Sequence, residues 1–342
     1  MKVLFNPKTF TGKDLDPETR ALFFKTIDWF EKKGLNALKQ DDMHYRWYDD
    51  FIRFQKEEKL FATLLTPSGY GKENSCYDLK RITRFNELLA FYSMAHRYVF
   101  QVSILGTGPI WMSDNEAVKK RTAALLQQGA IFGFGVSEKE HGADLYSNET
   151  FLTPCGDGTY KANGNKYYIG NSNKGYISTI GKIPETGEYV FFQVDSNHRN
   201  YNDQKRIVTL STHCAYVGQY ELVEYPITDD DIISRGDKAL EDALKTVNIG
   251  KFQVGVVPVG CCTHIGIKPT RTGNHHPFLV PFGMFTGNDG SVIIGAPNPK
   301  LWMMLCNVMG KSEIAKDPLF ATGADRLKNL DKLKVLISES GF

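Results

Sequence analysis

The spacing of apolar residues changes along this chain, and these changes constrain the fold more than any single motif. In the first hundred residues, apolar side chains recur at helical spacing, as at Phe23, Ile27 and Phe30. From about residue 130 to residue 231, short runs of Val, Ile, Tyr and Phe alternate with Gly, Asn, Asp and Pro, which is typical of strands joined by turns. We therefore predict a helical region followed by a strand-rich region that folds as an antiparallel barrel or sandwich.

Helical spacing returns after the strand-rich region. Residues 236–265 form one apolar helical run. The pattern then restarts near Gly266 with a loop, a hairpin signal over residues 282–296 and helical candidates at residues 299–309 and 325–339. We therefore expect an α+β multidomain protein in which a short helical segment precedes a small α+β C-terminal segment.

These changes divide the chain into four parts. We predict a helical N-terminal domain over residues 1–129, an antiparallel β-barrel middle domain over 130–232, a helical segment over 233–265 and a small α+β segment over 266–342. A chain of 342 residues is long enough to bury more than one core. The last join carries no low-complexity linker, so it is a change of pattern and not a tether.

Composition and charge argue against several function classes. Lys and Arg number 41 against 39 Asp and Glu, so the net charge of +2 provides no bulk field that would attract nucleic acid. The N-terminus lacks a secretory signal, and no window approaches the ~18 apolar residues of a membrane span. The six cysteines lack CxxC spacing. We therefore expect a cytoplasmic protein with no nucleic-acid partner, no membrane partner and no metal site.

Three glycine-containing motifs stand in the first three quarters of the chain. GVSEKEHGAD spans residues 135–144, NGNKYYIGN spans 163–171 and TVNIGKFQVG spans 246–255. Together they resemble the acyl-CoA dehydrogenase family, over about residues 1–265. The resemblance implies a helical domain, a central β-barrel and a C-terminal four-helix domain, with FAD between the barrel and the C-terminal helices. Only the first helix of the last domain has a counterpart in this chain.

The resemblance implies that FAD is bound by residues in and beside the first two motifs. They are Phe134, Val136, Ser137, Gly142, Ala143, Tyr168 and Gly170. A hydroxyl at Ser137 suits the edge of the isoalloxazine, where reduction places negative charge. Tyr168 replaces a Trp that covers one flavin face in the family, Gly170 replaces a Thr whose hydroxyl approaches the reactive flavin nitrogen, and Ala143 replaces a Ser. Without the resemblance, the two motifs are an ordinary solvated loop and a hairpin.

The third motif lacks a catalytic base. In the family, a Glu removes the α-proton of an acyl-CoA thioester while the β-hydrogen leaves as hydride, and in some members this Glu directly precedes a basic residue on the first C-terminal helix. Lys251 takes the basic position, Gly250 precedes it, and Asn248 lies near a polar CoA contact. Glu241 on the same helix is interpreted as a solvated charge. The catalytic residue is therefore unknown, and we expect no dehydrogenation at a normal rate.

A second group of motifs follows the join near Gly266. An R-x-G-N-x-H-P pattern comprises Arg271, Gly273, Asn274, His276 and Pro277, and DPLFATGADRLKNLDKL spans residues 317–333. Residues 266–342 resemble the small domain of family III CoA-transferases, which use an Asp nucleophile in a large domain that has no counterpart in this chain. Asn274, His275 and His276 offer polar contacts to a CoA tail, and adjacent histidines without a third ligand do not predict a metal.

The two resemblances predict an acyl-CoA dehydrogenase-like flavoprotein, impaired in catalysis and fused to a CoA-transferase segment. The expected ligands are FAD and an acyl-CoA or other CoA thioester. We also expect an electron-transfer partner, and a homo-oligomer because the missing helices leave apolar surface to be covered. Two alternatives remain open: a non-catalytic CoA- or FAD-binding fusion remnant, and a partial CoA-transferase lacking its Asp nucleophile. The sequence leaves undecided whether the protein is an enzyme.

Overall fold

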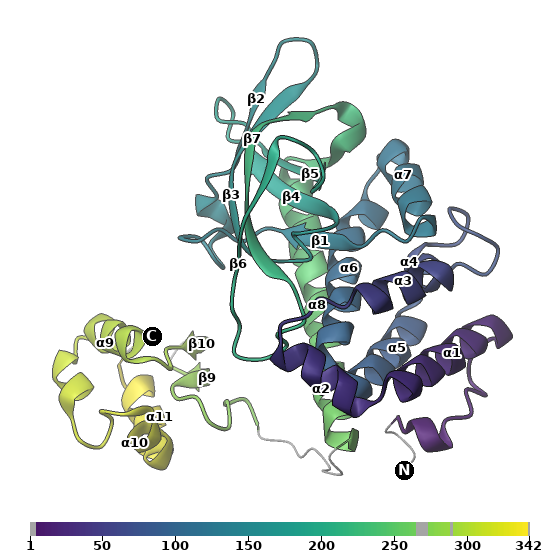
Figure 1. The fold of residues 1–342 in the computed structure, drawn as a ribbon. Helices are drawn as coiled ribbons and strands as arrows, with labels where there is room; N and C mark the ends of the chain where they lie inside the picture. The colour runs from purple at the N-terminus through teal and green to yellow at the C-terminus, as the bar shows by residue number, and fades with distance from the viewer. Residues whose placement is uncertain (1–4, 265–272, 288–289, 341–342) are drawn as a thin grey trace. The chain divides into compact units, whose positions relative to one another are not determined.

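The computed structural model describes residues 5–264, 273–287 and 290–340 (Figure 1). The chain divides into two compact units, Met1–Lys268 and Pro269–Phe342. The predicted helical N-terminal region, strand-rich middle region and α+β C-terminal segment are all present, whereas the four domain boundaries stay a prediction. No helix among these residues is both long and apolar enough to span a membrane.

Helices make up the described part of the first unit before its first strand. Asp16 caps the first long helix by accepting a hydrogen bond from Thr19 N at 2.9 Å, and Gly34 ends it with a φ of 76°. The apolar faces of these helices form one core. The helices are η1 (Pro7–Thr9), α1 (Pro17–Lys33), α2 (Leu35–Met43), α3 (Asp49–Glu57), α4 (Leu60–Leu65), α5 (Leu79–Tyr92), α6 (Met94–Met112) and α7 (Glu116–Gln127).

The middle region is an eight-stranded, mostly antiparallel sheet. Its strand order is β6-β7-β3-β2-β4-β5-β8, and β1 pairs in parallel with β4. The strands are β1 (Phe132–Gly135), β2 (Phe151–Pro154), β3 (Tyr160–Gly170), β4 (Tyr176–Lys182), β5 (Tyr189–Asp195), β6 (Tyr201–Arg206), β7 (Val217–Ile227) and β8 (Ile232–Arg235), with the short helices η2 (Leu145–Ser147) and η3 (Asp229–Asp231) between them.

The predicted antiparallel strands are confirmed, but the described strands do not close into a barrel. The end strands β6 and β8 are not paired with each other in this order. Strand β6 carries the exposed run Asn202 to Lys205, whose polar side chains keep that edge solvated. The sheet is therefore open on this side.

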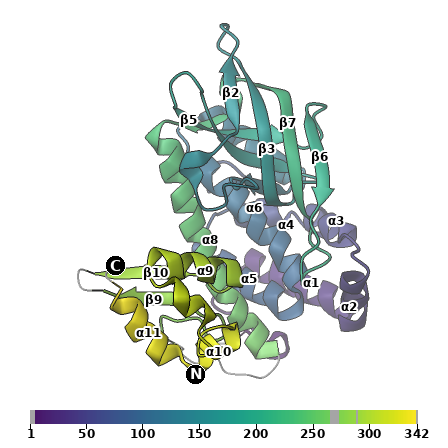
Figure 2. The same cartoon turned by 90° about the vertical axis from the view of Figure 1, so that its left-hand side faces the viewer.

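Helix α6 connects the helical region to the sheet. Ser178 Oγ on β4 donates a hydrogen bond to Gly106 O at 2.6 Å, and Asn171 Nδ2, at the end of β3, donates to Val99 O at 3.3 Å. Helix α8 (Asp237–His264) follows the sheet and runs beside α5 and α6 (Figures 1 and 2). One helix thus contacts both the sheet and the last helix of the unit.

A buried polar network holds α8 against α5 and α6. Asn86 Nδ2 donates to Gln253 Oε1 at 2.8 Å, and Arg97 donates to Gln253 O at 3.0 Å and to Asn86 Oδ1 at 3.2 Å. Gln253 Nε2 in turn donates to Thr83 Oγ1 at 3.3 Å. Buried polar groups with partners fix the position of a helix along its neighbours, because sliding would leave them unpaired.

The second unit packs a β-hairpin against helices, as its sequence pattern predicts. Arg326 is buried and donates to the backbone oxygens of Val280 (2.8 Å), Phe320 (2.9 Å) and Pro297 (3.1 Å), with its guanidinium 5.0 Å from the ring of Trp302. Thr322 caps the following helix by accepting from Asp325 N at 3.1 Å. The elements are β9 (Phe282–Thr286), β10 (Ser291–Gly295), α9 (Pro299–Val308), η4 (Ser312–Lys316), α10 (Gly323–Lys328) and α11 (Leu330–Ser338). The FATGADR motif therefore has a structural role in this unit.

Candidate functional site

Tyr168 is the most unusual residue of the strand that carries the second motif. The pairing of β3 with β7 shifts register between Tyr167 and Ile169, so Tyr168 lies in a β-bulge, and its φ is +68°. This conformation is uncommon for a residue other than glycine. The bulge leaves the Tyr168 side chain 54% exposed although it belongs to a long central strand. A bulge and an uncommon backbone conformation together are typical of functional positions.

The loop after β1 is fixed to β3 next to this bulge. Ser137 Oγ donates to Tyr167 O at 2.9 Å, and Tyr167 N donates to Ser137 O at 2.9 Å. The Ser137 hydroxyl therefore donates its proton to the main chain, and only its lone pairs are left to accept hydrogen bonds. Contact between this hydroxyl and a cofactor stays a prediction, and its position beside the bulge suits a ligand contact.

A buried ion pair anchors the same loop. Lys166 Nζ lies 2.9 Å from Glu138 Oε1, and Glu138 also accepts hydrogen bonds from Glu149 N (2.7 Å), Thr150 N (3.0 Å) and Thr150 Oγ1 (2.7 Å). Burial lowers the pKa of Lys166 to about 8 despite the opposing effect of Glu138. Burial by itself would raise the pKa of Glu138, but Lys166 and the hydrogen bonds outweigh it and lower that pKa. Glu138 thus positions the loop and is already fully partnered.

The remaining predicted cofactor residues differ in their exposure. Val136 is buried, Phe134 packs against Phe191 with ring centroids 5.9 Å apart, and Gly142 and Ala143 are exposed. A Cβ placed on Gly142 would have no atom within 4 Å, so the loop offers open backbone there. The structure brings Ser137 and Tyr168 together, with Gly142 and Ala143 on the exposed part of the same loop.

Gly170 lies where the backbone of β3 meets α6. A Cβ at this position would be 2.8 Å from Tyr98 Oη, 2.9 Å from Tyr98 Cε1 and 2.8 Å from Val102 Cγ2. Real Cβ atoms do not approach other atoms so closely, so α6 occupies the space of a side chain at 170. The threonine of the resembling family has no room in this structure.

Gly250, the position predicted to lack the base, also faces α6. A Cβ there would be 2.8 Å from Leu105 Cδ2 and 3.7 Å from Gln101 Nε2. Gln101 is buried and its Nε2 has no hydrogen-bond partner. The predicted substrate residues Asn248 and Lys251 are exposed on other faces of α8, and Glu241 pairs with Lys245 at 2.7 Å as a solvated charge, as predicted.

Sequence reasoning missed the α6 residues that contact these two glycines. Tyr98, Gln101, Val102 and Leu105 recur at helical spacing, so they were assignable to one face of a helix. A glycine in place of a large family residue indicates that another side chain fills the space. The sequence contains no signal that identifies α6 as the source of that side chain.

One cluster of potential metal ligands occurs in the described residues. Glu138, His141 and Glu149 each bring one ligand atom within 4.8 Å of the others. Glu138 already accepts from Lys166, Thr150 and Glu149, and His141 Nε2 lies 3.4 Å from Glu149 Oε1. Hydrogen bonds and ion pairs therefore account for the cluster, and the absence of a metal stays a prediction.

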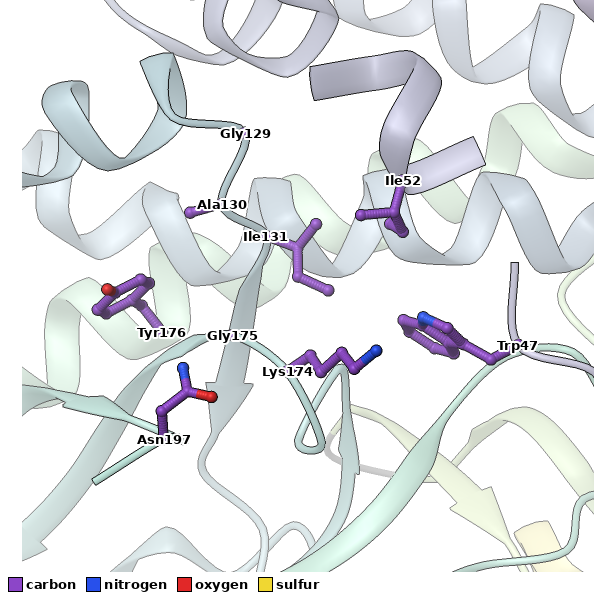
Figure 3. Close-up of a pocket in the computed structure, with 9 residues that line it drawn as sticks. All are labelled: Trp47, Ile52, Gly129, Ala130, Ile131, Lys174, Gly175, Tyr176 and Asn197. Atoms are coloured by element: carbon purple, nitrogen blue, oxygen red, sulfur yellow. The ribbon is translucent and has the colours of Figure 1, made fainter. Parts of the chain in front are cut away.

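A cavity of about 250 Å³ lies elsewhere in the first unit (Figure 3). None of the predicted cofactor residues lines it. Lys174 extends toward Trp47 in this view, and its ammonium is already paired with Asp49 Oδ1 at 3.1 Å. The lining residues are Trp47, Ile52, Gly129, Ala130, Ile131, Lys174, Gly175, Tyr176 and Asn197.

The second unit has a hollow of about 450 Å³ beside its hairpin. Asn274, His275 and His276 line it, as does Met284. His276 Nδ1 accepts hydrogen bonds from Phe278 N at 3.1 Å and Leu279 N at 3.0 Å, so that atom serves the local turn. The histidine pair thus faces a hollow, and contact with a CoA tail stays a prediction.

Comparison with known proteins separates the two units. Over 161 residues the chain is 22% identical to a short-chain-specific acyl-CoA dehydrogenase of Megasphaera elsdenii, a match that covers 46% of this chain and 42% of that protein. A solved acyl-CoA dehydrogenase of Bacillus anthracis, complexed with FAD, superposes with a TM-score of 0.63 at 19% identity, covering 98% of this chain and 56% of that one. The first unit therefore has the fold of the acyl-CoA dehydrogenases.

The second unit matches a different family. Residues 258–340 match the model of CoA-transferase family III. An acetyl-CoA:oxalate CoA-transferase of Acetobacter aceti is 38% identical over 80 residues, which cover 23% of this chain and 21% of that protein. Both resemblances seen in the sequence are thus confirmed. The chain spans less than half the length of either of these two curated relatives.

Proposed function

We propose that the first unit is an acyl-CoA dehydrogenase-like flavoprotein that binds FAD and an acyl-CoA thioester and is impaired in α,β-dehydrogenation. The observation that carries this proposal is Tyr168, whose ring is exposed on a bulge beside the anchored loop at Ser137. A flat aromatic plane next to open backbone suits a flavin ring. The likeness to a dehydrogenase complexed with FAD supports the choice of this cofactor.

The residues present can contact the ring and the phosphates of FAD, but they include no identified base for dehydrogenation. Tyr168 would stack on one face, Ser137 would meet an edge through its lone pairs, and the open backbone at Gly142 would approach the phosphates. When bound, FAD supplies a hydride acceptor. The exposed Asn248 and Lys251 on α8 would contact the CoA part of the substrate.

Impairment follows from the absence of a proton acceptor at position 250. The α-proton of a thioester leaves only if a base is held next to it. Gly250 has no side chain, and Leu105 fills the space where one would begin. We therefore propose that this chain binds its ligands but dehydrogenates them poorly.

Two measurements on the purified full chain test this function. Titration with FAD, followed by visible absorbance and flavin fluorescence, should show saturable binding at one site per chain. Acyl-CoA thioesters of several chain lengths should then reduce an electron-accepting dye far more slowly than in an active dehydrogenase. Failure to bind FAD refutes the cofactor assignment, and dye reduction at ordinary enzyme rates refutes the impairment.

A non-catalytic fusion remnant is the second candidate, because the space at both Gly170 and Gly250 is filled by α6. It predicts that the protein binds FAD or a CoA thioester without any substrate-dependent reduction of the dye. A partial CoA-transferase would require its Asp nucleophile from a separate chain, since only 21% of the matched CoA-transferase is covered.

The proposed dehydrogenase-like function carries further expectations. We propose an electron-transfer protein as partner, a homo-oligomer and a cytoplasmic location. Leu244 and Phe252 support the oligomer, because they leave apolar surface on α8 that is 53% and 58% exposed. Light scattering of the purified chain measures the oligomeric state directly.

A further inference from the structure

Tyr98 brings a phenol hydroxyl to the backbone beside Tyr168. Its Oη lies 2.8 Å from the position that a Cβ of Gly170 would take, two residues along β3 from Tyr168. Tyr98 stands on α6, which further hydrogen bonds fix to the sheet through Phe132 N and Ser103 Oγ at 3.2 Å. The phenol is therefore held in place by a rigid helix and not by a loop.

The Tyr98 hydroxyl is available to a ligand. Tyr98 is partly buried, and its Oη makes no hydrogen bond to another residue in the part of the chain that the structure describes. Burial raises the pKa of Tyr98 to about 12, with the neighbouring Tyr168 adding to this effect. The group is therefore a neutral donor at physiological pH, and because the residue is partly exposed a ligand acceptor can replace water at this hydroxyl.

Tyr48 provides a comparison in the same neighbourhood. It is 2% exposed, its ring packs 4.3 Å from Trp47 and 5.1 Å from His96, and its Oη has no hydrogen-bond partner among the described residues. Its ring belongs to the helical core. Tyr48 thus has the same chemistry as Tyr98, but the contact with Gly170 is made by Tyr98.

We propose that Tyr98 is a ligand-binding residue of the site at Tyr168, where its hydroxyl donates a hydrogen bond to the polar edge of the ring that stacks on Tyr168. A glycine stands at position 170 because the hydroxyl comes from Tyr98 on α6 and occupies the space of a side chain on β3. The inference rests on the proposed function in that it takes the ring to be the isoalloxazine of FAD. It adds a specific donor that neither sequence motif contains.

Removing one oxygen atom tests the inference. Tyr98→Phe keeps the ring and its packing, and it should weaken the binding of FAD and of riboflavin about tenfold, the effect of one neutral hydrogen bond, with a shift of the visible flavin bands. Riboflavin is included because it carries the isoalloxazine without the adenylate. The matched control Tyr48→Phe should bind both flavins as the wild-type chain does.

The outcomes distinguish a failure of the proposed flavin binding from a failure of the role assigned to Tyr98. If the wild-type chain binds no flavin, the proposed function fails and this inference fails with it. If the wild-type chain binds flavin and Tyr98→Phe binds it equally well with the same spectrum, the inference alone is overturned. Tighter binding by Tyr98→Ala than by the wild-type chain also overturns it, because Tyr98 would then obstruct the site.

An exchange of the two side chains adds an independent test. Gly170→Thr alone should lower the stability of the fold, because the new Cβ meets Tyr98 and Val102 at 2.8 Å. In a Tyr98→Ala, Val102→Ala background both contacts are removed, and the threonine hydroxyl returns from β3. Adding Gly170→Thr to this background should therefore tighten riboflavin binding, and equal binding with and without Gly170→Thr contradicts a hydroxyl role at this position.

Discussion

Lys166 and Glu138 form a buried ion pair, with 2.9 Å between the ammonium nitrogen and a carboxylate oxygen, that ties the loop after β1 to strand β3. The Lys166 side chain is fully buried and that of Glu138 is 6% exposed. Two charges in such a place stabilise the fold only as a pair, because each alone would be unsolvated. The position of the candidate site thus depends on this contact.

Lys166→Met should therefore cost about 3–5 kcal/mol of unfolding free energy, because it leaves the Glu138 carboxylate buried without its partner. Urea unfolding followed by circular dichroism measures the change. The matched control is Lys161→Met, which removes the partner of Glu224 at 2.8 Å from a pair that is about half exposed on both sides. That variant should lose much less unfolding free energy, because solvent screens an exposed pair, and equal losses at the two positions would contradict the importance of burial.

The stability of the helical core should fall in acid because of His96. Burial among aromatic rings lowers the pKa of His96 to about 3 from its ordinary 6.5, with Lys33 adding to the decrease. Below pH 6.5 the unfolded chain takes up a proton that the folded chain refuses, so the folded state loses up to about 1.4 kcal/mol for each pH unit. This loss continues until the pH nears the folded-state pKa.

His96→Phe removes this proton uptake. Between pH 7 and pH 5 the wild-type chain should lose about 2 kcal/mol more unfolding free energy than the variant does. Urea titrations at the two pH values give the comparison, and His96→Gln is a second variant in case Phe disturbs the packing. Parallel pH dependence in wild-type and variant chains would show that His96 is not the source.

Helix α8 should depend on the Gln253 side chain for its position. Gln253→Ala removes the acceptor of Asn86 Nδ2 and leaves that buried amide unpaired, at a cost of about 1–3 kcal/mol. Amide hydrogen exchange in α8 should increase at the same time. Asn248→Ala, on the exposed side of the same helix, should change stability by less than about 0.5 kcal/mol.

The contact between Gly250 and Leu105 should show as coupling in a double-mutant cycle. Gly250→Ala should stabilise the Leu105→Ala variant by about 1 kcal/mol through helix propensity, and it should gain clearly less in the wild-type chain. Gly255→Ala is the control, since a Cβ there meets nothing within 4 Å, and it should gain about 1 kcal/mol in both backgrounds. Additive effects at 250 and 105 would argue against the close contact.

Local signals made much of the fold predictable. The cap at Asp16, the end of α1 at Gly34 and the capping box at Thr322 follow from short-range chemistry, and each is present. The apolar spacing also located the strand-rich region and the helix after it. These features need only neighbours within one turn or one hairpin.

The features that decide the site depend on residues far apart in the sequence. Tyr98 and Gly170, like Leu105 and Gly250, meet only after α6 has packed between β3 and α8. The sequence indicated that two side chains were missing, but it could not show that their space was filled. The open edge at β6 escaped prediction for the same reason, since strand order is a property of the assembled sheet.

Helix α6 fills the side-chain space at both Gly170 and Gly250, and this limits which substitutions the two positions accept. A base introduced at Gly250 first meets Leu105, and a hydroxyl introduced at Gly170 first meets Tyr98. Each of these two changes therefore loses packing energy that a smaller residue on α6 would restore. A base at position 250 or a hydroxyl at position 170 should thus be tolerated best together with a change on α6.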